Sequence, residues 1–473
     1  MKITIGSSNF RASDVARACG GQLVGADRAV LRVCTDSREA AADDLFVALR
    51  GERTDGHVYI LKAIEQGCRV VLCEAFPELP EGVEATAVVV PDTSRALCAL
   101  AESYLNGKSL VRVAVTGSVG KTTTKEFLRA ILSRRFNTYK TEANYNSTIG
   151  MSVSALGVSA AHTAAVLEMG MSARGEIEAL SRIVRPDVAV ITNIGSSHLE
   201  YLKTRENIAL AKLEITAGLR EGGLLVLNGD EPLLADVASE HYRVCRVCVA
   251  GEGDYTVTSF AQCHENWTTT FCLRTPTGEV LSDLRIPAIG QHMVYDAAYA
   301  VAVGLELGLS EQEIRAGLAE YQGLRQHLVQ LGDITVLEDC YNAAPESMSE
   351  ALHVLVSYAR ARGTRAVAVL GDMRELGENS RQMHETIGAE VAALGVDVLF
   401  TLGELGVSIA EGALGAGMTD GCVHMFRETD DLTDAATAIS ERLHSGDIVL
   451  LKASRALAAE RMIDTWKELR QTN

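Results

Sequence analysis

The sequence predicts an α/β protein of three domains, and three observations support this. A chain of 473 residues is too long for one ordinary core, because single domains typically hold about 100–200 residues. From Val111 onward, short apolar runs that end in glycine alternate with helix-like stretches, as in a parallel sheet covered by helices. After about residue 308 the same alternation starts again. We therefore expect a small α/β domain followed by two larger domains with parallel sheets.

The first two segments differ in their rhythm. Residues 1–107 mix short strands and helices and end on a helix-like stretch. Residues 108–322 open with the strand VRVAVTG, a glycine-rich loop and the helix TTTKEFLRAILSRRF. The later runs AAVLEMG, DVAVITNIG and LLVLNGD predict further buried strands, and an amphipathic helix is expected over about 293–308.

The third segment, residues 323–473, alternates strands and helices regularly. Its expected strands are TVLEDCY, RAVAVLGDM, DVLFTLG and DIVLLKA, and its first helix is expected over 347–361. This order predicts a separate doubly wound, Rossmann-like domain at the C-terminal end of the chain.

The composition is that of a soluble globular protein. Hydrophobic residues make up 47% and charged residues 22% of the sequence. No apolar run approaches the roughly 20 residues that span a bilayer, and the first residues lack the regions of a signal peptide, so we expect a cytoplasmic protein without a membrane span. The 11 cysteines are scattered and odd in number, as in a reducing compartment. The formal net charge of −18 argues against nucleic acid as a partner, since that needs a basic surface.

The most informative segment is VTGSVGKTT at residues 115–123. It joins a buried strand to a helix, so its backbone N–H groups can cradle phosphates at the positive end of the helix. Lys121 would reach the outer phosphates, and the Thr122 hydroxyl would hold magnesium. Val115 stands at the first glycine position of the pattern GxxxxGK[ST], yet Gly-Lys-Thr in this setting still predicts nucleotide binding. The expected ATP-binding residues of the loop are Thr116, Gly117, Ser118, Val119, Gly120, Lys121, Thr122 and Thr123.

Two polar residues follow other expected strands. Glu168 ends the run AAVLEMG, and His198 follows DVAVITNIG. Ligands of open α/β sheets gather beyond the carboxyl ends of the strands, so both side chains could face the same crevice as Lys121. There they could hold a hard cation that bridges phosphates. Taken singly, each is more often a solvated or capping residue, but their shared position favours a function.

Lys212 lies in the helix-like run 206–216 with apolar neighbours at helical spacing, among them Ile208, Ala209 and Ile215. A lysine buried in this way has a lowered pKa and exposes a neutral amine. The alternative is a lysine whose stem follows an apolar face while its ammonium group stays in water. The spacing alone does not separate the two.

Several segments carry a family resemblance. TGSVGKTTTKE, EANYNSTIGMS, EMGMSARGEI, ITNIGSSHLE and IALAKLEI, in this order, resemble the central domain of the Mur ligases of peptidoglycan synthesis. DSR at 36–38, GERTDGH at 51–57, DCYNAAPESM at 339–348 and LGDMRELG at 370–377 are similar to the member of that family that adds a dipeptide. The last two segments argue against a sister ligase that adds one amino acid and against a folylpolyglutamate-type synthetase.

The resemblance implies a domain for the UDP-sugar, a central ATPase domain, and a C-terminal domain that closes over the nucleotide and brings in the dipeptide. It implies that D-alanyl-D-alanine is joined to UDP-N-acetylmuramoyl-tripeptide through an acyl phosphate, with ATP and Mg²⁺ required. We expect a monomer. No motif reads the third residue of the peptide, so lysine and diaminopimelate both stay open.

The resemblance also implies a role for individual residues. The catalytic residues would be Lys121, Lys212, His198 and Glu168. The metal would be held by Thr122, Glu168, His198 and Lys212, the last of these as a carbamylated lysine. Outside the loop, ATP would contact Asp296, Arg325, Asp339 and Asn342. The substrates would contact Ser37, Arg38, Arg53, Asp55, Gly56, His57, Asn144, Asn146, Lys452, Ser454 and Arg455.

Four positions depart from the family pattern. Ser147, Asp296 and Ala344 stand where asparagine is expected, and Ala453 stands in place of a glycine. Asp296 puts adenine recognition in question. A rival from another class is a nucleotide switch that uses ATP to change shape, and it predicts little turnover that depends on a carboxylate substrate.

Overall fold

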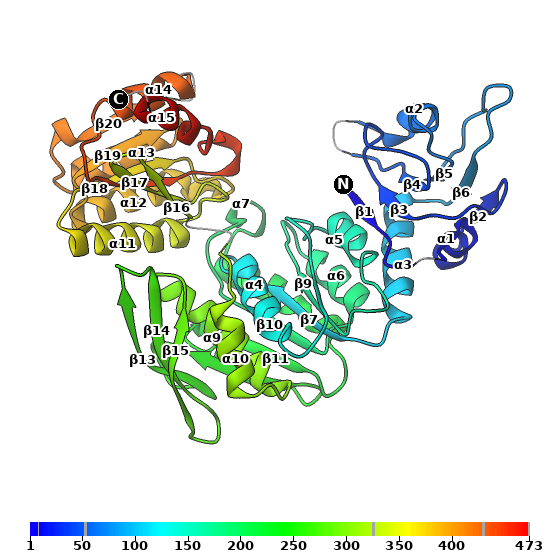
Figure 1. The fold of residues 1–473 in the computed structure, drawn as a ribbon, viewed down its shortest axis with the longest axis horizontal. Coiled ribbons are helices and arrows are strands. Elements are labelled where there is room, and N and C mark those ends of the chain that lie inside the picture. Colours follow the sequence, from blue (N-terminus) through cyan, green and yellow to red (C-terminus); the bar gives the residue numbers. More distant parts are fainter. Residues whose placement is uncertain (8, 52–53, 324–326, 428–430, 472–473) are drawn as a thin grey trace.

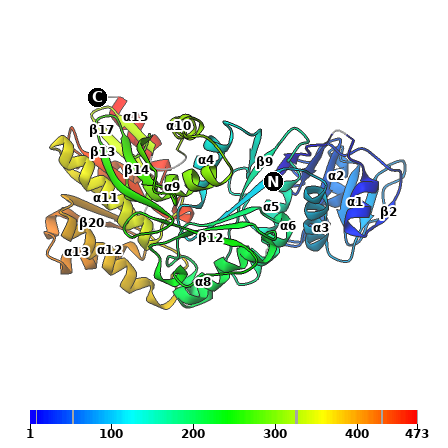
Figure 2. The ribbon, with the colours of Figure 1, turned by 90° about the horizontal axis from the view of Figure 1, so that it is seen from below.

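The computed structural model describes residues 1–471 except 8, 52–53, 324–326 and 428–430. Within these residues the strands form three sheets, of six, nine and six strands, each with helices packed on it. In Figure 1 the N-terminal unit lies at the right and the C-terminal unit at the upper left, with the central unit between and below them. Figure 2 shows the same units from below, with the N-terminal unit again at the end away from the C-terminal unit. The three-domain α/β architecture is thereby confirmed. In the described chain, no helix combines the length and apolarity needed to cross a bilayer.

The N-terminal sheet has the strand order β1-β3-β4-β5-β6-β2. Strands β3 to β6 are parallel, and β1 and β2 pair antiparallel at the two edges. The strands are β1 Lys2–Thr4, β2 Gln22–Val24, β3 Arg32–Cys34, β4 Asp44–Val47, β5 Val70–Cys73 and β6 Thr86–Val89. The helices are α1 Ala12–Cys19, α2 Ile60–Glu65 and α3 Thr93–Asn106, with a 3₁₀ turn at Gly56–Tyr59.

The central sheet has the order β15-β14-β13-β12-β11-β10-β7-β9-β8. Its strands are β7 Val111–Thr116, β8 Thr138–Lys140, β9 Ala164–Glu168, β10 Val188–Ile191, β11 Leu224–Asn228, β12 Arg243–Cys248, β13 Tyr255–Cys263, β14 Thr268–Arg274 and β15 Val280–Ile286. Its helices are α4 Lys121–Leu132, α5 Thr148–Ala155, α6 Glu176–Val184, α7 Leu199–Leu202, α8 Arg205–Leu213, α9 Gln291–Glu306 and α10 Glu311–Ala319, with 3₁₀ turns at Glu214–Gly218 and Pro232–Leu234.

The parallel sheet expected for this domain runs from β8 to β13, and β14 and β15 extend it antiparallel. Buried residues alternate with half-buried ones along β14 and with exposed ones along β15. Such an alternation is typical of antiparallel strands with one wet face. It differs from the continuous apolar runs by which the parallel strands were predicted.

The C-terminal sheet has the order β16-β17-β21-β18-β19-β20, parallel except for the edge pair β16 and β17. Its strands are β16 His327–Leu331, β17 Ile334–Glu338, β18 Ala366–Gly371, β19 Val398–Leu402, β20 Val423–Phe426 and β21 Ile448–Lys452. Its helices are α11 Pro345–Arg362, α12 Ser380–Leu394, α13 Gly406–Gly415, α14 Leu432–Ser440 and α15 Arg461–Gln471, with 3₁₀ turns at Gly377–Asn379, Asp420–Cys422 and Arg455–Leu457. The helix expected over 347–361 falls within α11.

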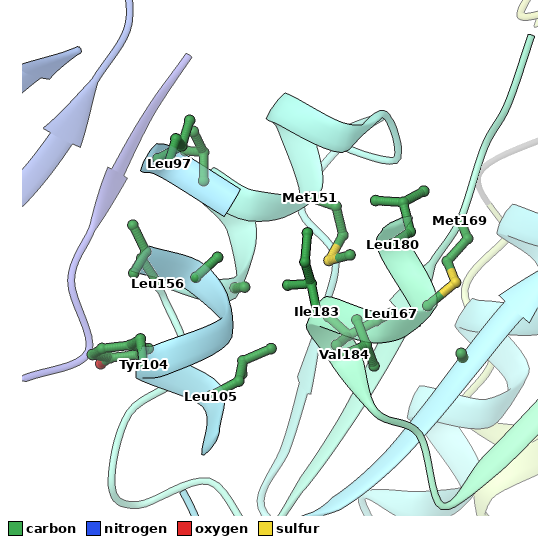
Figure 3. Close-up of a cluster of buried hydrophobic side chains, with 14 of the residues drawn as sticks. Leu97, Tyr104, Leu105, Met151, Leu156, Leu167, Met169, Leu180, Ile183 and Val184 are labelled. Atoms are coloured by element: carbon green, nitrogen blue, oxygen red, sulfur yellow. The ribbon is translucent and has the colours of Figure 1, made fainter. Parts of the chain in front are cut away.

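The first two units share one hydrophobic core. Helix α3 packs against α5 and α6 of the central unit, and the side chains of Leu97, Tyr104 and Leu105 meet those of Met151 and Ile183 in a single buried cluster (Figure 3). That cluster extends from the N-terminal sheet to one face of the central sheet. The C-terminal sheet has separate clusters on its two faces. The N-terminal and central units are therefore joined by packing, not only by the chain.

Candidate functional site

Two cavities border the loop between β7 and α4. Cavity A, about 450 Å³, is lined by Ser118 to Lys121 and by side chains that include Asn146, Glu168, His198, Lys212, Tyr341 and Asn342. Cavity B, about 500 Å³, is lined by Val119, Gly120 and Thr123 and by side chains that include Asp230, His292, Tyr295, Asp296, Asp339, Glu346, Glu350 and Lys452. Both cavities take part of their lining from the central domain and part from the C-terminal domain.

The loop needs glycine at two positions. Gly117 has φ 155° and Gly120 has φ 85°, in the region that residues with a Cβ rarely adopt. A Cβ at Gly117 would lie 1.8 Å from Oγ1 of Thr192, and one at Gly120 would lie 2.4 Å from Oδ1 of Asp296. The backbone is thus pressed between β10 and α9, which fixes the curve of the loop.

Hydrogen bonds within the protein fix the shape of the loop. Oδ1 of Asn193 accepts the N–H groups of Ser118 (3.1 Å) and Val119 (2.8 Å). The ammonium of Lys121 donates to the carbonyls of Gly117 (2.7 Å) and Ser118 (3.2 Å), so it lies across the mouth of the loop. A phosphate bound here would meet a positive charge and the N-terminus of α4 together.

Glu168, at the end of β9, is 2% exposed and forms the centre of a charged network. Its carboxylate accepts from Oγ1 of Thr122 (3.1 Å) and Nδ2 of Asn146 (2.9 Å), and Nζ of the buried Lys125 lies 3.2 Å away. Burial alone would raise the pKa of Glu168, but the charges of Lys125 and Lys121 and the bond from Asn146 outweigh it and lower that pKa. The carboxylate therefore stays ionised beside the loop, as a cation ligand must.

Lys212, near the end of α8, is 1% exposed. The side chain therefore does not extend into bulk water. Of the two alternatives, the structure has the buried lysine. Burial, and then the nearby charge of Lys121, lower the pKa of Lys212 well below its usual value. The side chain lines cavity A as an amine whose neutral form is favoured.

His198 precedes α7 and contacts the C-terminal domain. Its Nδ1 lies 2.5 Å from Oε2 of Glu375, and this contact lowers the pKa of the glutamate. Nearby, Oε1 of Glu346 accepts from the backbone N–H and the hydroxyl of Ser196, both at 2.7 Å. The C-terminal domain is thus docked onto the edge of the sheet where Glu168 and His198 lie.

The residues expected to face the nucleotide are divided between the cavities. Asp296 and Asp339 line cavity B, and Asn342 lines cavity A. Oδ1 of Asp296 accepts from Oγ1 of Thr124 at 2.9 Å. The buried Lys452, expected to contact substrate, also lines cavity B, where its Nζ lies 2.6 Å from Oδ2 of Asp339. Arg325 lies outside the described residues.

The residues expected to face the UDP-sugar lie in the N-terminal domain, and those described there line neither cavity. Ser37 is buried, while Arg38 is exposed and pairs with Asp36 at 2.6 Å, lowering the pKa of that carboxyl to about 2. Nδ1 of His57 lies 2.6 Å from Asp55, and its Nε2 accepts the backbone N–H of Glu74. Both ring nitrogens of His57 are therefore engaged within the protein.

The other residues expected to contact a substrate lie in all three domains. Gly56 packs so closely that a Cβ there would lie 2.6 Å from the carbonyl oxygen of Leu49, and Arg53 lies outside the described residues. Asn146 lines cavity A, whereas Asn144 is exposed outside both described cavity linings. Ser454 is buried, and Arg455 pairs with Glu460 at 3.0 Å, both likewise outside those linings.

Sequence reasoning missed several residues of the site. Lys125 lies four residues after Lys121 on α4, and that helical spacing could have placed both on one face. Asn193 is the second residue after β10 and could have been found as a strand-end residue. Glu346 and Glu375 meet their partners only because the third domain docks on the second, and no local pattern predicts such a contact.

The donor set suits a divalent cation that is held partly by phosphates. In the described part of the chain, no group of three His, Cys, Asp or Glu side chains could hold a metal by itself. Mg²⁺ is typically bound by one or two carboxylates together with substrate phosphates and water. Glu168, ionised and bonded to the Thr122 hydroxyl beside the loop, meets that description.

Models of known protein families match parts of all three domains. Residues 30–104 match the model of the Mur ligase family catalytic domain, residues 115–304 the Mur ligase middle domain, and residues 324–455 the Mur ligase glutamate ligase domain. UDP-N-acetylmuramoyl-tripeptide--D-alanyl-D-alanine ligase of Bacillus subtilis is 39% identical, over 91% of this chain and 92% of the relative. The ligase of the same name from Escherichia coli is 33% identical, over 96% and 98%.

Solved structures of related proteins have the same fold over nearly the whole chain. MurF from Acinetobacter baumannii superposes with a TM-score of 0.86 at 31% identity, over 98% of this chain and 100% of that one. MurF of Thermotoga maritima in complex with ADP gives a TM-score of 0.79 at 27% identity, over 93% and 98%. The chain belongs to the Mur ligase family.

Proposed function

We propose that this protein is an ATP-dependent ligase that joins D-alanyl-D-alanine to UDP-N-acetylmuramoyl-tripeptide in peptidoglycan synthesis. The observation that best supports this is the lining of cavity A, which brings together the phosphate loop with Lys121, the ionised Glu168 and the buried Lys212. Tyr341 and Asn342 of the C-terminal domain complete that lining. A phosphate, a carboxylate and an amine supplied from different domains can meet there.

The carboxylate has to be activated before an amine can attack it. A carboxylate does not acylate an amine unaided, because oxide is a poor leaving group. The terminal carboxylate of the tripeptide attacks the γ-phosphorus of ATP, which forms a C–O–P acyl phosphate and releases ADP. The neutral amine of D-alanyl-D-alanine then attacks the acyl carbon, loses a proton and expels phosphate. Lys121 stabilises the charge on the transferring phosphoryl group, and the docked domains exclude water.

Mg²⁺ and a modified lysine complete the proposed site. Thr122, Glu168, His198 and Lys212 would hold the metal, which supplies positive charge to the phosphates. For Lys212 to take part, its neutral amine adds carbon dioxide, forming an N–C bond and releasing a proton. The product is a carbamate anion with two oxygens. The lowered pKa of Lys212 supports this, because only the unprotonated amine can react.

We also propose a role for each domain: residues 1–107 bind the UDP-muramoyl substrate, residues 108–322 bind ATP, and residues 323–473 close over the nucleotide and bind the dipeptide. A cytoplasmic location and a monomer fit an enzyme whose substrates are ATP and UDP-linked sugars.

The test of the function is phosphate release by the purified protein with ATP, the tripeptide substrate and D-alanyl-D-alanine. Release should need all three, and omitting any one should reduce it to background. Release that is indifferent to the dipeptide would exclude the ligase. Nucleotide-dependent change of shape without turnover would instead favour a nucleotide switch.

Arg38 offers a test of the substrate domain. Arg38→Ala should weaken the UDP-sugar substrate roughly ten- to hundredfold through loss of a charge-assisted hydrogen bond, and leave ATP affinity unchanged. The measurement is calorimetric titration of each ligand. Arg17→Ala is a matched control, since Arg17 is also exposed and pairs with a nearby aspartate, Asp14 at 3.2 Å. Equal losses for both ligands would contradict a dedicated sugar-nucleotide domain.

A further inference from the structure

One contact between domains falls on a proposed metal ligand. Nδ1 of His198 lies 2.5 Å from Oε2 of Glu375. His198 follows β10 in the central domain, and Glu375 follows β18 in the C-terminal domain. Oε2 of Glu375 therefore faces the Nδ1 edge of the ring at close range, without the alignment of a full hydrogen bond. A carboxylate at this edge favours the tautomer with its proton at Nδ1, in which the other ring nitrogen, Nε2, keeps its lone pair and can bind a cation.

The backbones on both sides are shaped for this contact. His198 has φ 68° and Glu375 has φ 65°, a conformation that residues with a Cβ rarely adopt. Unusual backbone conformations persist where the surrounding structure enforces them. Here the backbone N–H of Glu200 donates to the carbonyl of Glu375 at 3.1 Å, and a Cβ at Gly377 would lie 3.0 Å from Cα of Glu200. The loop after β18 therefore lies directly on the start of α7.

We propose that Glu375 is a positioning residue, which orients the imidazole of His198 so that Nε2 faces the metal. The proposal rests on the Mg²⁺ site described under the proposed function. Metal-binding histidines usually donate their second N–H to a carboxylate or carbonyl, which fixes the ring and makes the ligating nitrogen more basic. In this protein that carboxylate comes from another domain.

Because Glu375 belongs to the C-terminal domain, its contact with His198 depends on the docking of the two domains. When the C-terminal domain is away from the central domain, His198 lacks its partner and its ring is free to turn. When the domain docks, Glu375 sets the ring, and the metal site gains its full affinity. Docking of the domain that brings in the dipeptide and tight binding of the metal are then one event.

Binding of Mn²⁺, a paramagnetic substitute for Mg²⁺, tests this. The free Mn²⁺ signal in electron paramagnetic resonance gives its dissociation constant for the full-length protein with ADP. Glu375→Ala should weaken Mn²⁺ binding about 10–100-fold, in the range seen for such supporting residues. Glu375→Gln keeps an oxygen acceptor and should lose less. ADP affinity without metal should not change.

A matched control lies in the same loop. Glu378 is exposed three residues further on, and Glu378→Gln removes the same charge. It should bind Mn²⁺ like the unaltered protein, which separates the effect of contact from that of net charge. Equal melting temperatures of all variants would exclude a general loss of structure.

A spectroscopic readout separates positioning from structural support. Electron spin-echo modulation from an imidazole nitrogen should be present in the unaltered protein, absent in His198→Ala, and weaker or altered in Glu375→Ala. Unchanged Mn²⁺ affinity and modulation in Glu375→Ala, with both lost in His198→Ala, would overturn the positioning role alone. Tighter Mn²⁺ binding in Glu375→Ala would also overturn it, since Glu375 would then be a competitor. If His198→Ala itself leaves Mn²⁺ binding intact, the proposed metal site fails, and the positioning role with it.

Discussion

Replacing Lys121 with alanine is expected to lower kcat by about 10³-fold or more, the cost of losing a group that stabilises charge in the transition state. The ammonium of Lys121 lies across the phosphate loop, bonded to two of its carbonyls. A positive charge at this point is most useful when the transferring phosphoryl group is most loosely bonded. The measurement is ADP formation under saturating substrates.

The same substitution has a second effect. The charge of Lys121 helps to lower the pKa of Lys212. Without it the amine of Lys212 holds its proton more firmly, and less of it can add carbon dioxide. Raising the bicarbonate concentration should therefore recover only a small part of the lost activity. Lys62→Ala, at an exposed lysine of α2, is the control and should be fully active. A Lys121→Ala enzyme with near-normal turnover would exclude the role of the loop in phosphate transfer.

Lys212→Arg is expected to be as inactive as Lys212→Ala, with both reduced by at least two orders of magnitude, as for other groups that stabilise transition-state charge. Guanidinium keeps its positive charge and cannot be carbamylated, so it repels a cation where a carbamate would bind one. Because the residue is buried in cavity A, the sign of its charge decides whether a cation can bind beside it.

Acetate distinguishes the two variants. In Lys212→Ala the vacated space can admit a small carboxylate, which supplies the missing oxygens and should restore part of the activity. In Lys212→Arg the space is filled and no recovery is expected. Peptide-bond formation by both variants is measured across an acetate series at fixed ionic strength, with chloride as the control anion. An active arginine variant would show that this position provides positive charge and not a carbamate.

The sequence predicted best what depends on one strand and the residues just after it. The loop, Glu168 and His198 all lie where parallel strands end at one edge of a sheet, and the structure gathers them in cavity A. The sequence does not decide whether Lys212 is buried, because periodicity gives the face of a helix but not what covers that face. In the structure Lys212 is buried, because α8 packs its apolar side against the core.

What the sequence could not predict depends on contacts between distant segments. The pair His198 and Glu375 joins residues of two domains, and only the docking of those domains creates it. The engagement of His57 with Asp55 and Glu74 likewise needs two segments to come together. Strands β14 and β15 lack the signal that predicts the parallel strands, because their buried residues alternate with more exposed ones and form no continuous apolar run.

The core that α3 shares with α5 and α6 holds the N-terminal and central domains at a fixed distance from each other. Packing, and not a linker, fixes the span from the proposed UDP surface at residues 36–57 to the phosphate loop. A substrate anchored by its UDP group can present its carboxylate to ATP only if the sugar and peptide between them match that span. Under the proposed function, this fixed distance between the two anchored ends would select the length of the peptide, without a pocket that recognises each side chain.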